Sequence, residues 1–377
     1  MAADTKKTAT IDSAALLAGA RALLRPDIRA MSGYTPGEQV PGAIKLNTNE
    51  CAYPPSPRVM EALAQIADNS LRLYPDPVSR RLREVAATVY GVSPEQILAG
   101  NGSDDCLTIL YRAFMDPGAG DRVACPWPTY GLYQTLASLQ GVAIDRLPFR
   151  FENGGRRWTL PETLAASGAK LVMIANPNNP SSTLIPVDDL RRLCDASAGI
   201  VVVDEAYVDF AAGDGTTASV LPWLDQHPNL VVLRTFSKSY SLAGARLGLL
   251  FAAAPLVAEL NKVKDSYNVN VITQALGIAA LEDRAYHAEI IARTLAERAK
   301  VQAALAALGL TWPEAHGNFL LCDFGTRAEA IYRSLKAAGV IVRYWNTPEL
   351  KTKLRITIGS PDENDRLITA LRGLIVT

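Results

Sequence analysis

The sequence has few cysteines and fewer histidines, and neither set is spaced like a metal site or a disulfide framework. The five cysteines are an odd number, are widely spread and contain no C-x-x-C pair, which argues against paired disulfides and a structural zinc site. We expect buried free thiols in a reducing compartment. The three histidines lie far apart in the sequence, so we expect neither a metal centre nor a histidine-based proton relay.

Net charge and long apolar runs are also missing. The 38 lysines and arginines balance the 38 aspartates and glutamates, so no global basic field attracts nucleic acid or an anionic membrane, although a local anion site remains compatible with this balance. No apolar stretch reaches about 18 residues, the length of a membrane span. The first ten residues, MAADTKKTAT, lack the apolar core of a signal peptide. We expect a cytoplasmic protein.

The length of 377 residues exceeds what one core usually holds, so we expect two domains after an N-terminal arm. Residues 1–45 form a polar tail and an irregular arm that packs with the smaller domain or a dimer partner. In residues 46–266, apolar runs alternate with amphipathic helical stretches, which predicts an α/β domain with a mostly parallel sheet between helices. Residues 267–377 hold a long helical tract, about 271–308, and then short strands, which predicts a smaller α+β domain. The predicted strands are 121–126, 170–177, 199–207, 229–237, 247–252, 318–324, 339–345 and 353–359.

Polar residues that follow the predicted strands are the candidates for a ligand site, because ligands of open α/β sheets bind at the carboxyl ends of strands. In LAGNGSDD (98–105), Gly102 allows close backbone approach, and Ser103 and Asp104 begin a helix whose free N–H groups face an anion. In NPNNP (176–180), Asn179 before a proline is a rigid amide or part of a plain turn. Asp204 ends the buried run VVVD, where it caps a helix or pairs with a cationic ring nitrogen.

The stretch RTFSKSYSLAGARLG (234–248) places a single lysine among hydroxyl residues at the exit of a strand. A partly buried lysine has a lowered pKa, which makes Lys238 a nucleophile and Schiff-base former, whereas an exposed one is only a surface charge. Thr235, Ser237 and Arg246 provide donors that suit a phosphate. A phosphate cradle, a carboxylate for a ring nitrogen, an amide and a Schiff-base lysine together are what pyridoxal phosphate (PLP) requires.

The chain resembles the fold-type-I PLP-dependent aminotransferases and, among them, the histidinol-phosphate aminotransferase family, from about residue 25 onward. The stretches that carry the resemblance are KLNTNECAYPPSP, RLYPDP, GNGSDD, PTYGLY, NPNNPSS, VVVDEAYVDF, TFSKSYSLAGARLG, YNVNVITQ, HGNFLL and LRITIG. The resemblance implies a large domain with a mostly parallel seven-stranded sheet between helices, a smaller α+β domain, bound PLP and a homodimer.

The resemblance also implies roles for individual residues. Lys238 bonds to the cofactor and moves the proton at the substrate Cα, and Asp204 pairs with the pyridine nitrogen. The other cofactor contacts that it implies are Asn179 and Tyr207 at the ring oxygen, Tyr130 on the ring face, Gly102, Ser103, Asp104, Thr235, Ser237 and Arg246 at the phosphate, and Tyr74 from the neighbouring subunit. The implied substrate contacts are Arg355, Arg343, Tyr53 and Asn49.

Two stretches depart from the family pattern. NECAY (49–53) stands where the family usually has NENPY, beside the substrate, and NPNNPSS (176–182) stands where it usually has NPNNPTG, so that Ser182 replaces a turn glycine. Neither change removes a cofactor contact.

We expect reversible transamination of L-histidinol phosphate with 2-oxoglutarate, which gives imidazole-acetol phosphate and glutamate. The alternatives are an aromatic amino-acid aminotransferase, a PLP-dependent threonine-phosphate decarboxylase and a non-enzymatic ligand-binding protein. The intact set of Lys238, Asp204 and Arg246 argues against the last.

Overall fold

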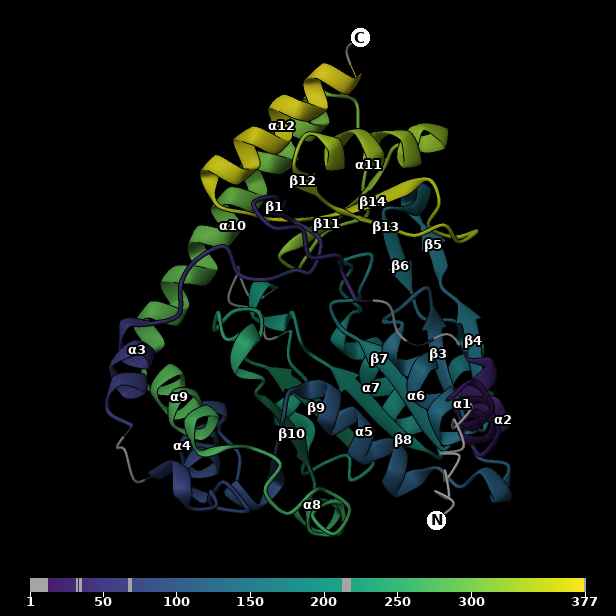
Figure 1. The fold of residues 1–377 in the computed structure, drawn as a ribbon, viewed down its shortest axis with the longest axis vertical. Helices are drawn as coiled ribbons and strands as arrows, with labels where there is room; N and C mark the ends of the chain where they lie inside the picture. Colours follow the sequence, from purple (N-terminus) through teal and green to yellow (C-terminus); the bar gives the residue numbers. More distant parts are fainter. Residues whose placement is uncertain (1–12, 32, 34–35, 67–69, 212–217, 376–377) are drawn as a thin grey trace, which may run out of the picture.

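The structure, a computed structural model, describes residues 13–31, 33, 36–66, 70–211 and 218–375 of the chain. Figure 1 shows a large sheet flanked by helices and, above it, a smaller layer of strands and helices that carries the C-terminus. Residues 1–12 of the predicted tail lie outside the described residues.

The central sheet has seven strands in the order β2–β10–β9–β8–β7–β3–β4. Neighbouring strands pair in parallel except at β10, which runs antiparallel to both β2 and β9. The expected mostly parallel seven-stranded sheet between helices is confirmed. The strands are β2 (Ile97–Gly100), β3 (Arg122–Trp127), β4 (Ala143–Pro148), β7 (Leu171–Ala175), β8 (Ile200–Asp204), β9 (Leu230–Thr235) and β10 (Gly248–Ala252).

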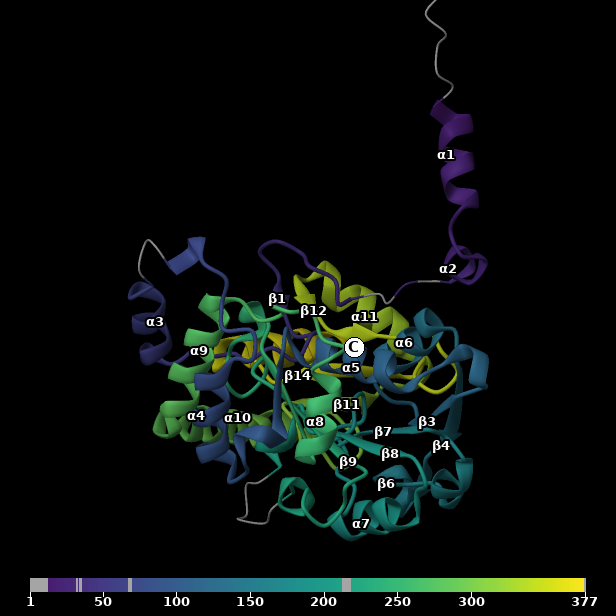
Figure 2. The same ribbon diagram turned by 90° about the horizontal axis from the view of Figure 1, so that it is seen from below.

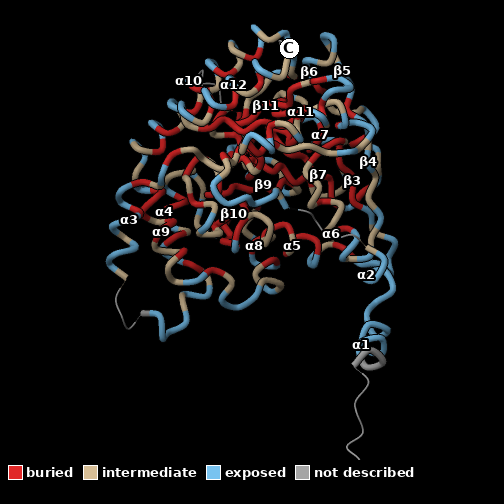
Figure 3. The backbone as a smooth tube through the Cα atoms, turned by 45° about the horizontal axis from the view of Figure 1, so that its top comes forward, coloured by how far each residue is buried: buried red, intermediate tan, exposed pale blue. Residues whose placement is uncertain are grey.

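The middle strands are apolar up to their carboxyl ends because helices cover both faces of the sheet. Successive side chains alternate between the faces, so that Val201 and Val203 belong to one core cluster and Val202 to another. Figure 3 shows these strands as the buried interior of the molecule. One face is covered by α5 (Ser103–Phe114), α6 (Leu132–Gln140) and α8 (Ala254–Leu260), and the other by α4 (Arg80–Tyr90), α7 (Val187–Ala196) and α9 (Val271–Glu282).

The C-terminal part of the chain builds a second layer around a three-stranded antiparallel sheet in the order β11–β14–β13. Its strands and helices share a core cluster of their own. The short strand β1 (Ile44–Lys45) pairs in parallel with β12 (Val340–Ile341), so this end of the N-terminal arm joins the second layer. The elements are β11 (Phe319–Asp323), β13 (Arg343–Tyr344), β14 (Lys353–Thr357), α10 (Arg284–Ala307), α11 (Ala328–Ala337) and α12 (Pro361–Ile375).

The long helical tract predicted over 271–308 is two helices, α9 and α10. Asp283 separates them with φ −93° and ψ 66°, and its side chain accepts a hydrogen bond from the backbone N–H of Tyr286, which caps α10. A short antiparallel hairpin of β5 (Arg150–Glu152) and β6 (Arg157–Thr159) was not expected from the sequence. These differences leave the expected arrangement of a large and a small layer intact. The domain boundaries at residues 45 and 266 stay predictions.

Figure 2 shows α1 (Ser13–Ala22) and α2 (Pro26–Ala30) at the edge of the molecule, with α1 pointing away from it. All five cysteines are free, and four of them are buried. Among the described residues, no helix is both long and apolar enough to cross a membrane.

Candidate active site

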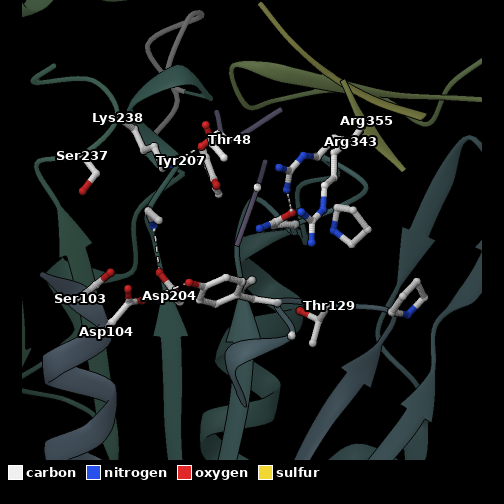
Figure 4. Close-up of a pocket in the computed structure, with 18 of the residues that line it drawn as sticks. Thr48, Ser103, Asp104, Thr129, Asp204, Tyr207, Ser237, Lys238, Arg343 and Arg355 are labelled. Atoms are coloured by element: carbon white, nitrogen blue, oxygen red, sulfur yellow. Dashed lines mark hydrogen bonds between the residues drawn. The ribbon is translucent and has the colours of Figure 1, made fainter. Parts of the chain in front are cut away.

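The carboxyl ends of the central strands face a cavity of about 540 Å³ between the two layers. Figure 4 shows Asp204 at the end of β8, Ser103 and Asp104 at the start of α5, and Arg343 and Arg355 reaching in from the smaller sheet. Each layer supplies only part of the lining, so the site depends on how the large and small sheets pack together.

Lys238 lies in the loop after β9, and its side chain lines the cavity. Its Nζ donates a hydrogen bond to the backbone carbonyl of Thr48 at 3.0 Å. Burial, followed by the positive charge of Arg355, lowers the pKa of Lys238 from its ordinary 10.5 to about 8. Far more of this amine is therefore neutral near neutral pH than of an ordinary lysine, and the neutral amine is the form that acts as a nucleophile and as a proton acceptor.

Asp204 lies at the floor of the cavity with only 5% of its surface exposed. Its carboxylate accepts hydrogen bonds from the hydroxyl of Tyr133 at 3.0 Å and from the backbone N–H of Ala206 at 3.2 Å. Burial raises the pKa of Asp204 to about 6, while the Tyr133 hydrogen bond opposes that rise. A buried carboxylate with a raised pKa attracts a cationic partner, such as a protonated ring nitrogen.

An anion cradle forms where β2 and β10 lie side by side. Gly102 has φ +88° and precedes α5, and Ser103 begins the helix, whose first N–H groups have no partner within it. A Cβ on Gly102 would come within 2.6 Å of Nη2 of Arg246, and a Cβ on Gly248 would come within 2.3 Å of the backbone nitrogen of Ser103. Glycine at both positions therefore lets a helix N-terminus and a guanidinium converge.

The hydroxyls that the sequence places around Lys238 complete this cradle. The Thr235 hydroxyl donates to Oγ of Ser237 at 3.0 Å, and Nη1 of Arg246 reaches the same oxygen at 3.5 Å. Asp104 forms an ion pair with Arg246 at 3.2 Å and accepts a hydrogen bond from the hydroxyl of Tyr130 at 3.1 Å. The carboxylate of Asp104 therefore orients the arginine and the tyrosine, and it carries the wrong charge to bind a phosphate itself.

Arg355 connects the smaller sheet to the cavity. It extends from β14, and its two terminal nitrogens donate to Oδ1 of Asn179 at 2.5 Å and to the backbone carbonyl of Asn47 at 2.6 Å. Arg343 donates to the backbone carbonyl of Pro36 at 2.9 Å, and both guanidinium groups lie 5.2 Å from the ring centroid of Trp345. Both arginines line the cavity, and a planar guanidinium suits the carboxylate or phosphate of an anionic substrate.

Tyr207 and Asn49 meet at the back of the cavity. Nδ2 of Asn49 donates to the Tyr207 hydroxyl at 3.1 Å, and the Tyr207 ring lies 5.6 Å from Nζ of Lys238. Burial raises the pKa of Tyr207. Tyr207 lines the cavity, whereas Asn49 is outside its lining and reaches it through this hydrogen bond. The structure thus brings Asn49 to the site as a support for Tyr207.

Two of the expected contacts do not reach the cavity of this chain. Tyr74 is 80% exposed and stacks on Tyr267, with ring centroids 4.3 Å apart. Tyr53 is buried beneath the guanidinium of Arg293, 4.0 Å from its ring centroid, and is not part of the lining. Tyr53 is therefore placed for packing, and Tyr74 is free to contact another chain.

Several residues that line or support the cavity had not been singled out from the sequence. Tyr133 supports Asp204 from a position 71 residues away in the chain, and the second tyrosine of PTYGLY was its only signal. Thr48 contributes a backbone carbonyl, which no side-chain pattern reveals. The lining also includes Glu50, Trp127, Gln134, Arg146 and Trp345.

The residues present fit PLP. The glycine-lined cradle, with a helix N-terminus, two hydroxyls and Arg246, suits a phosphate. The buried carboxylate of Asp204 suits a protonated ring nitrogen, and the amine of Lys238 opens into the same cavity.

Comparison with known proteins gives the same result. The family described as aminotransferase class I and II matches residues 41–371. The histidinol-phosphate aminotransferase 1 of Trichormus variabilis is 42% identical over 357 residues, which cover 93% of this chain and 98% of the relative. The histidinol-phosphate aminotransferase of Synechocystis is 39% identical over 354 residues, with coverage of 93% and 98%.

Solved structures agree at the level of the fold. The histidinol-phosphate aminotransferase of Sinorhizobium meliloti, in complex with pyridoxal-5'-phosphate, superposes with a TM-score of 0.84 at 28% identity, covering 94% of this chain and 98% of that one. An N-succinyldiaminopimelate aminotransferase of Mycobacterium tuberculosis, at 20% identity and a TM-score of 0.78, shares the fold.

Proposed function

This chain belongs to the class I and II aminotransferase family, and on that premise we propose that it uses PLP to transfer the amino group of L-histidinol phosphate to 2-oxoglutarate, in histidine biosynthesis. One observation carries the proposal: the amine of Lys238 opens into the same cavity as the buried Asp204 and two arginines from the smaller sheet. The near-full-length relatives named histidinol-phosphate aminotransferase support the choice of substrate.

The lining residues would hold PLP by its charged and polar ends. The start of α5, the hydroxyls of Thr235 and Ser237, and Arg246 would hold the phosphate, and Asp204 would pair with the ring nitrogen. Asn179 and Tyr207 would contact the ring oxygen and Tyr130 would cover the ring face, since all three line the cavity. When bound, PLP supplies an aldehyde that accepts the amino group and a ring that withdraws electrons from the substrate Cα.

Lys238 would act as the general base at the substrate Cα. Its lowered pKa, which arises from burial and from the charge of Arg355, leaves the amine able to accept that proton near neutral pH. Its flexible four-carbon chain lets the same amine return the proton at the opposite end of the reacting system. The smaller layer, which forms part of the lining, would help to exclude water from this transfer.

Arg355 and Arg343 would bind the anionic end of each substrate. Histidinol phosphate carries a phosphate and 2-oxoglutarate carries carboxylates, and a planar guanidinium suits both. Binding at Arg355 would replace its contacts with Asn179 and the Asn47 carbonyl.

We expect a homodimer in which Tyr74 reaches the partner's cofactor phosphate. The exposed Tyr74 ring has exposed apolar neighbours, with Leu71 at 60% and Leu73 at 59%, which support an interface at this surface. The cytoplasmic location and the division into an arm, a large domain over 46–266 and a small domain over 267–377 are part of the same proposal.

An absorbance spectrum of the purified protein with added PLP tests the proposal first, followed by titrations with histidinol phosphate and with phenylalanine. We expect a visible band that histidinol phosphate converts at much lower concentration than phenylalanine, with glutamate formed from 2-oxoglutarate. A protein that stays colourless with PLP would refute the cofactor assignment. Preference for phenylalanine would make it an aromatic aminotransferase, and release of CO₂ from threonine phosphate without glutamate would make it a decarboxylase.

A further inference from the structure

A buried cluster of charges lies behind the cavity, on the side of β8 and β9 that faces away from it. Asp204 and Thr235 line the cavity, whereas their chain neighbours Glu205 and Arg234 do not. Side chains alternate along a strand, and the pairing of β8 with β9 continues through the hydrogen bond from the Glu205 N–H to the Leu233 carbonyl at 2.9 Å. On the side of β8 and β9 that faces away from the cavity, the acidic side chain of Glu205 therefore meets the basic side chain of Arg234.

Arg234 is the centre of this cluster. Its Nη1 donates to Oδ1 of Asp209 at 2.7 Å, and its Nε lies 2.9 Å from Oε2 of Glu205 without the alignment of a hydrogen bond. Glu205 also accepts from the backbone N–H of Val220 at 2.7 Å and from the Ser219 hydroxyl at 2.8 Å. One guanidinium thus holds two carboxylates, of which Glu205 directly follows β8 and Asp209 lies in the short 3-10 helix Val208–Phe210.

The charges of the cluster depend on one another. Burial alone would raise the pKa of Asp209, yet the charge of Arg234 and the contacts with His287 and Ser239 hold this pKa below its ordinary value. Arg234 itself is 7% exposed and Glu205 is 1% exposed. Removal of one partner would leave a buried charge uncompensated. The intact cluster therefore holds its members in fixed relative positions.

The cluster is connected to Lys238 through the next residue of the chain. The Ser239 hydroxyl donates to Oδ2 of Asp209 at 2.5 Å. Beyond it, Tyr240 stacks on His287 with ring centroids 4.0 Å apart, and Nε2 of His287 lies 3.6 Å from the same Asp209 oxygen. The backbone that carries Lys238 is therefore anchored on the side that faces away from the cavity.

We propose that Asp209, held by Arg234, is a positioning residue for Lys238: through Ser239 it fixes the loop so that the lysine amine meets the cofactor and the substrate Cα in one geometry. The inference rests on the proposed role of Lys238. Asp209 touches neither cofactor nor substrate in this arrangement, and it acts only through the loop.

Ser239→Ala tests the link because it removes the single side-chain hydrogen bond between the loop and Asp209. Ser241→Ala is the matched control, since Ser241 lies in the same loop and its buried hydroxyl has no hydrogen-bond partner among the described residues. Ser239→Thr keeps a hydroxyl and serves as the rescue variant. The measurements are kcat and KM for both substrates, circular dichroism of the visible cofactor band, and hydrogen exchange of residues 236–242 in the cofactor-free protein.

We expect Ser239→Ala to lower kcat roughly ten-fold, the effect of losing one hydrogen bond to a charged group, with KM changed less than about two-fold. The dichroism of the cofactor band weakens and exchange in the loop accelerates, while Ser241→Ala and Ser239→Thr stay close to the unmodified protein. Asp209→Asn, if it folds, shows the same pattern more strongly.

The inference is wrong if Ser239→Ala lowers thermal stability but leaves kcat, dichroism and loop exchange unchanged. If the unmodified protein fails to bind PLP, the proposed function fails instead, and loop exchange in the cofactor-free protein still decides whether Asp209 anchors the loop.

Discussion

Lys238 is surrounded by three hydroxyl residues that serve opposite sides of one loop. Thr235 and Ser237 face the cavity and contact each other, and Ser237 also contacts Arg246, whereas Ser239 turns away to Asp209. A single lysine among hydroxyls is thus the result of two requirements that meet at one loop: a phosphate must be bound on one side and the backbone must be anchored on the other.

Replacement of Lys238 by alanine removes the amine that would bond with the cofactor in our proposal. We expect the visible absorbance band to disappear and kcat to fall by about 10²–10⁴-fold, the usual loss for a missing acid–base group. Absorbance spectra and single-turnover kinetics measure both. Lys300→Ala is the control, because the Lys300 side chain is 71% exposed; a Lys238→Ala protein that keeps the band would contradict the assignment.

The depressed pKa of Lys238 predicts how the stability of the cofactor-free protein depends on pH. With a folded pKa of about 8 against an ordinary 10.5, the folded state binds fewer protons than the unfolded state between these values. The free energy of unfolding therefore rises as pH increases from about 8 to about 10.5, and the full penalty is present below pH 8.

Urea unfolding across this range, compared with Lys238→Met, isolates the lysine. We expect a rise on the order of 3 kcal/mol in the unmodified protein relative to the variant. Parallel pH profiles for the two proteins would show that burial of Lys238 carries no such penalty.

At the scale of elements, the packing of β10 against the start of α5 decides whether the anion cradle forms. Gly248→Ala places a methyl group 2.3 Å from the backbone nitrogen of Ser103, so the helix start has to move. We expect a loss of about 1–3 kcal/mol in stability, the usual effect of overpacking, and weaker PLP binding.

Thermal unfolding and PLP titration measure these two effects. Gly19→Ala in α1 is the control, because no atom lies within 4 Å of its added Cβ and alanine favours a helix. PLP affinity that is unchanged in Gly248→Ala would show that the helix start is not part of the cradle.

The elements that could be predicted are those whose signal is local. The buried strands β7, β8 and β9 lie within the runs that predicted them, because a strand covered on both faces is apolar over most of its length. Edge strand β4 was not predicted, since its exposed and half-buried side chains produce no such run. The position of β10 between β2 and β9 depends on contacts between distant residues, which periodicity does not encode.

The same difference between local signals and contacts of distant residues applies to the candidate site. Residues at strand exits, such as Asp204 and Lys238, could be found because parallel strands end at one edge of the sheet. Tyr53 could not be placed, because the choice between the cavity and packing beneath Arg293 is made by α10, far along the chain. Ser182 adopts φ +68° where the family usually has glycine, and its hydroxyl accepts a hydrogen bond from the Gly317 N–H at 2.8 Å, a compensation invisible in the sequence.

At the scale of the whole molecule, the expected homodimer makes each site a product of two chains. Mixing Lys238→Ala with Tyr74→Ala chains tests this, because a mixed dimer has one site with both residues intact and one site with neither. Random exchange makes about half of the dimers mixed, so activity should return to about a quarter of that of the unmodified enzyme. The recovered activity is measured after denaturation and refolding of the mixture. Activity that stays at the level of the separate variants would show that Tyr74 serves no partner.

The pairing of β2 with β10 has a consequence for the synthesis of the protein. Gly100 pairs with Gly248, so the two sides of the anion cradle are 248 − 100 = 148 residues apart in the chain. At about 5–20 residues per second, a ribosome needs about 7–30 seconds to synthesise the second side after the first. The nascent chain therefore completes its phosphate site late, and PLP would bind only when the strands of the large sheet have been synthesised.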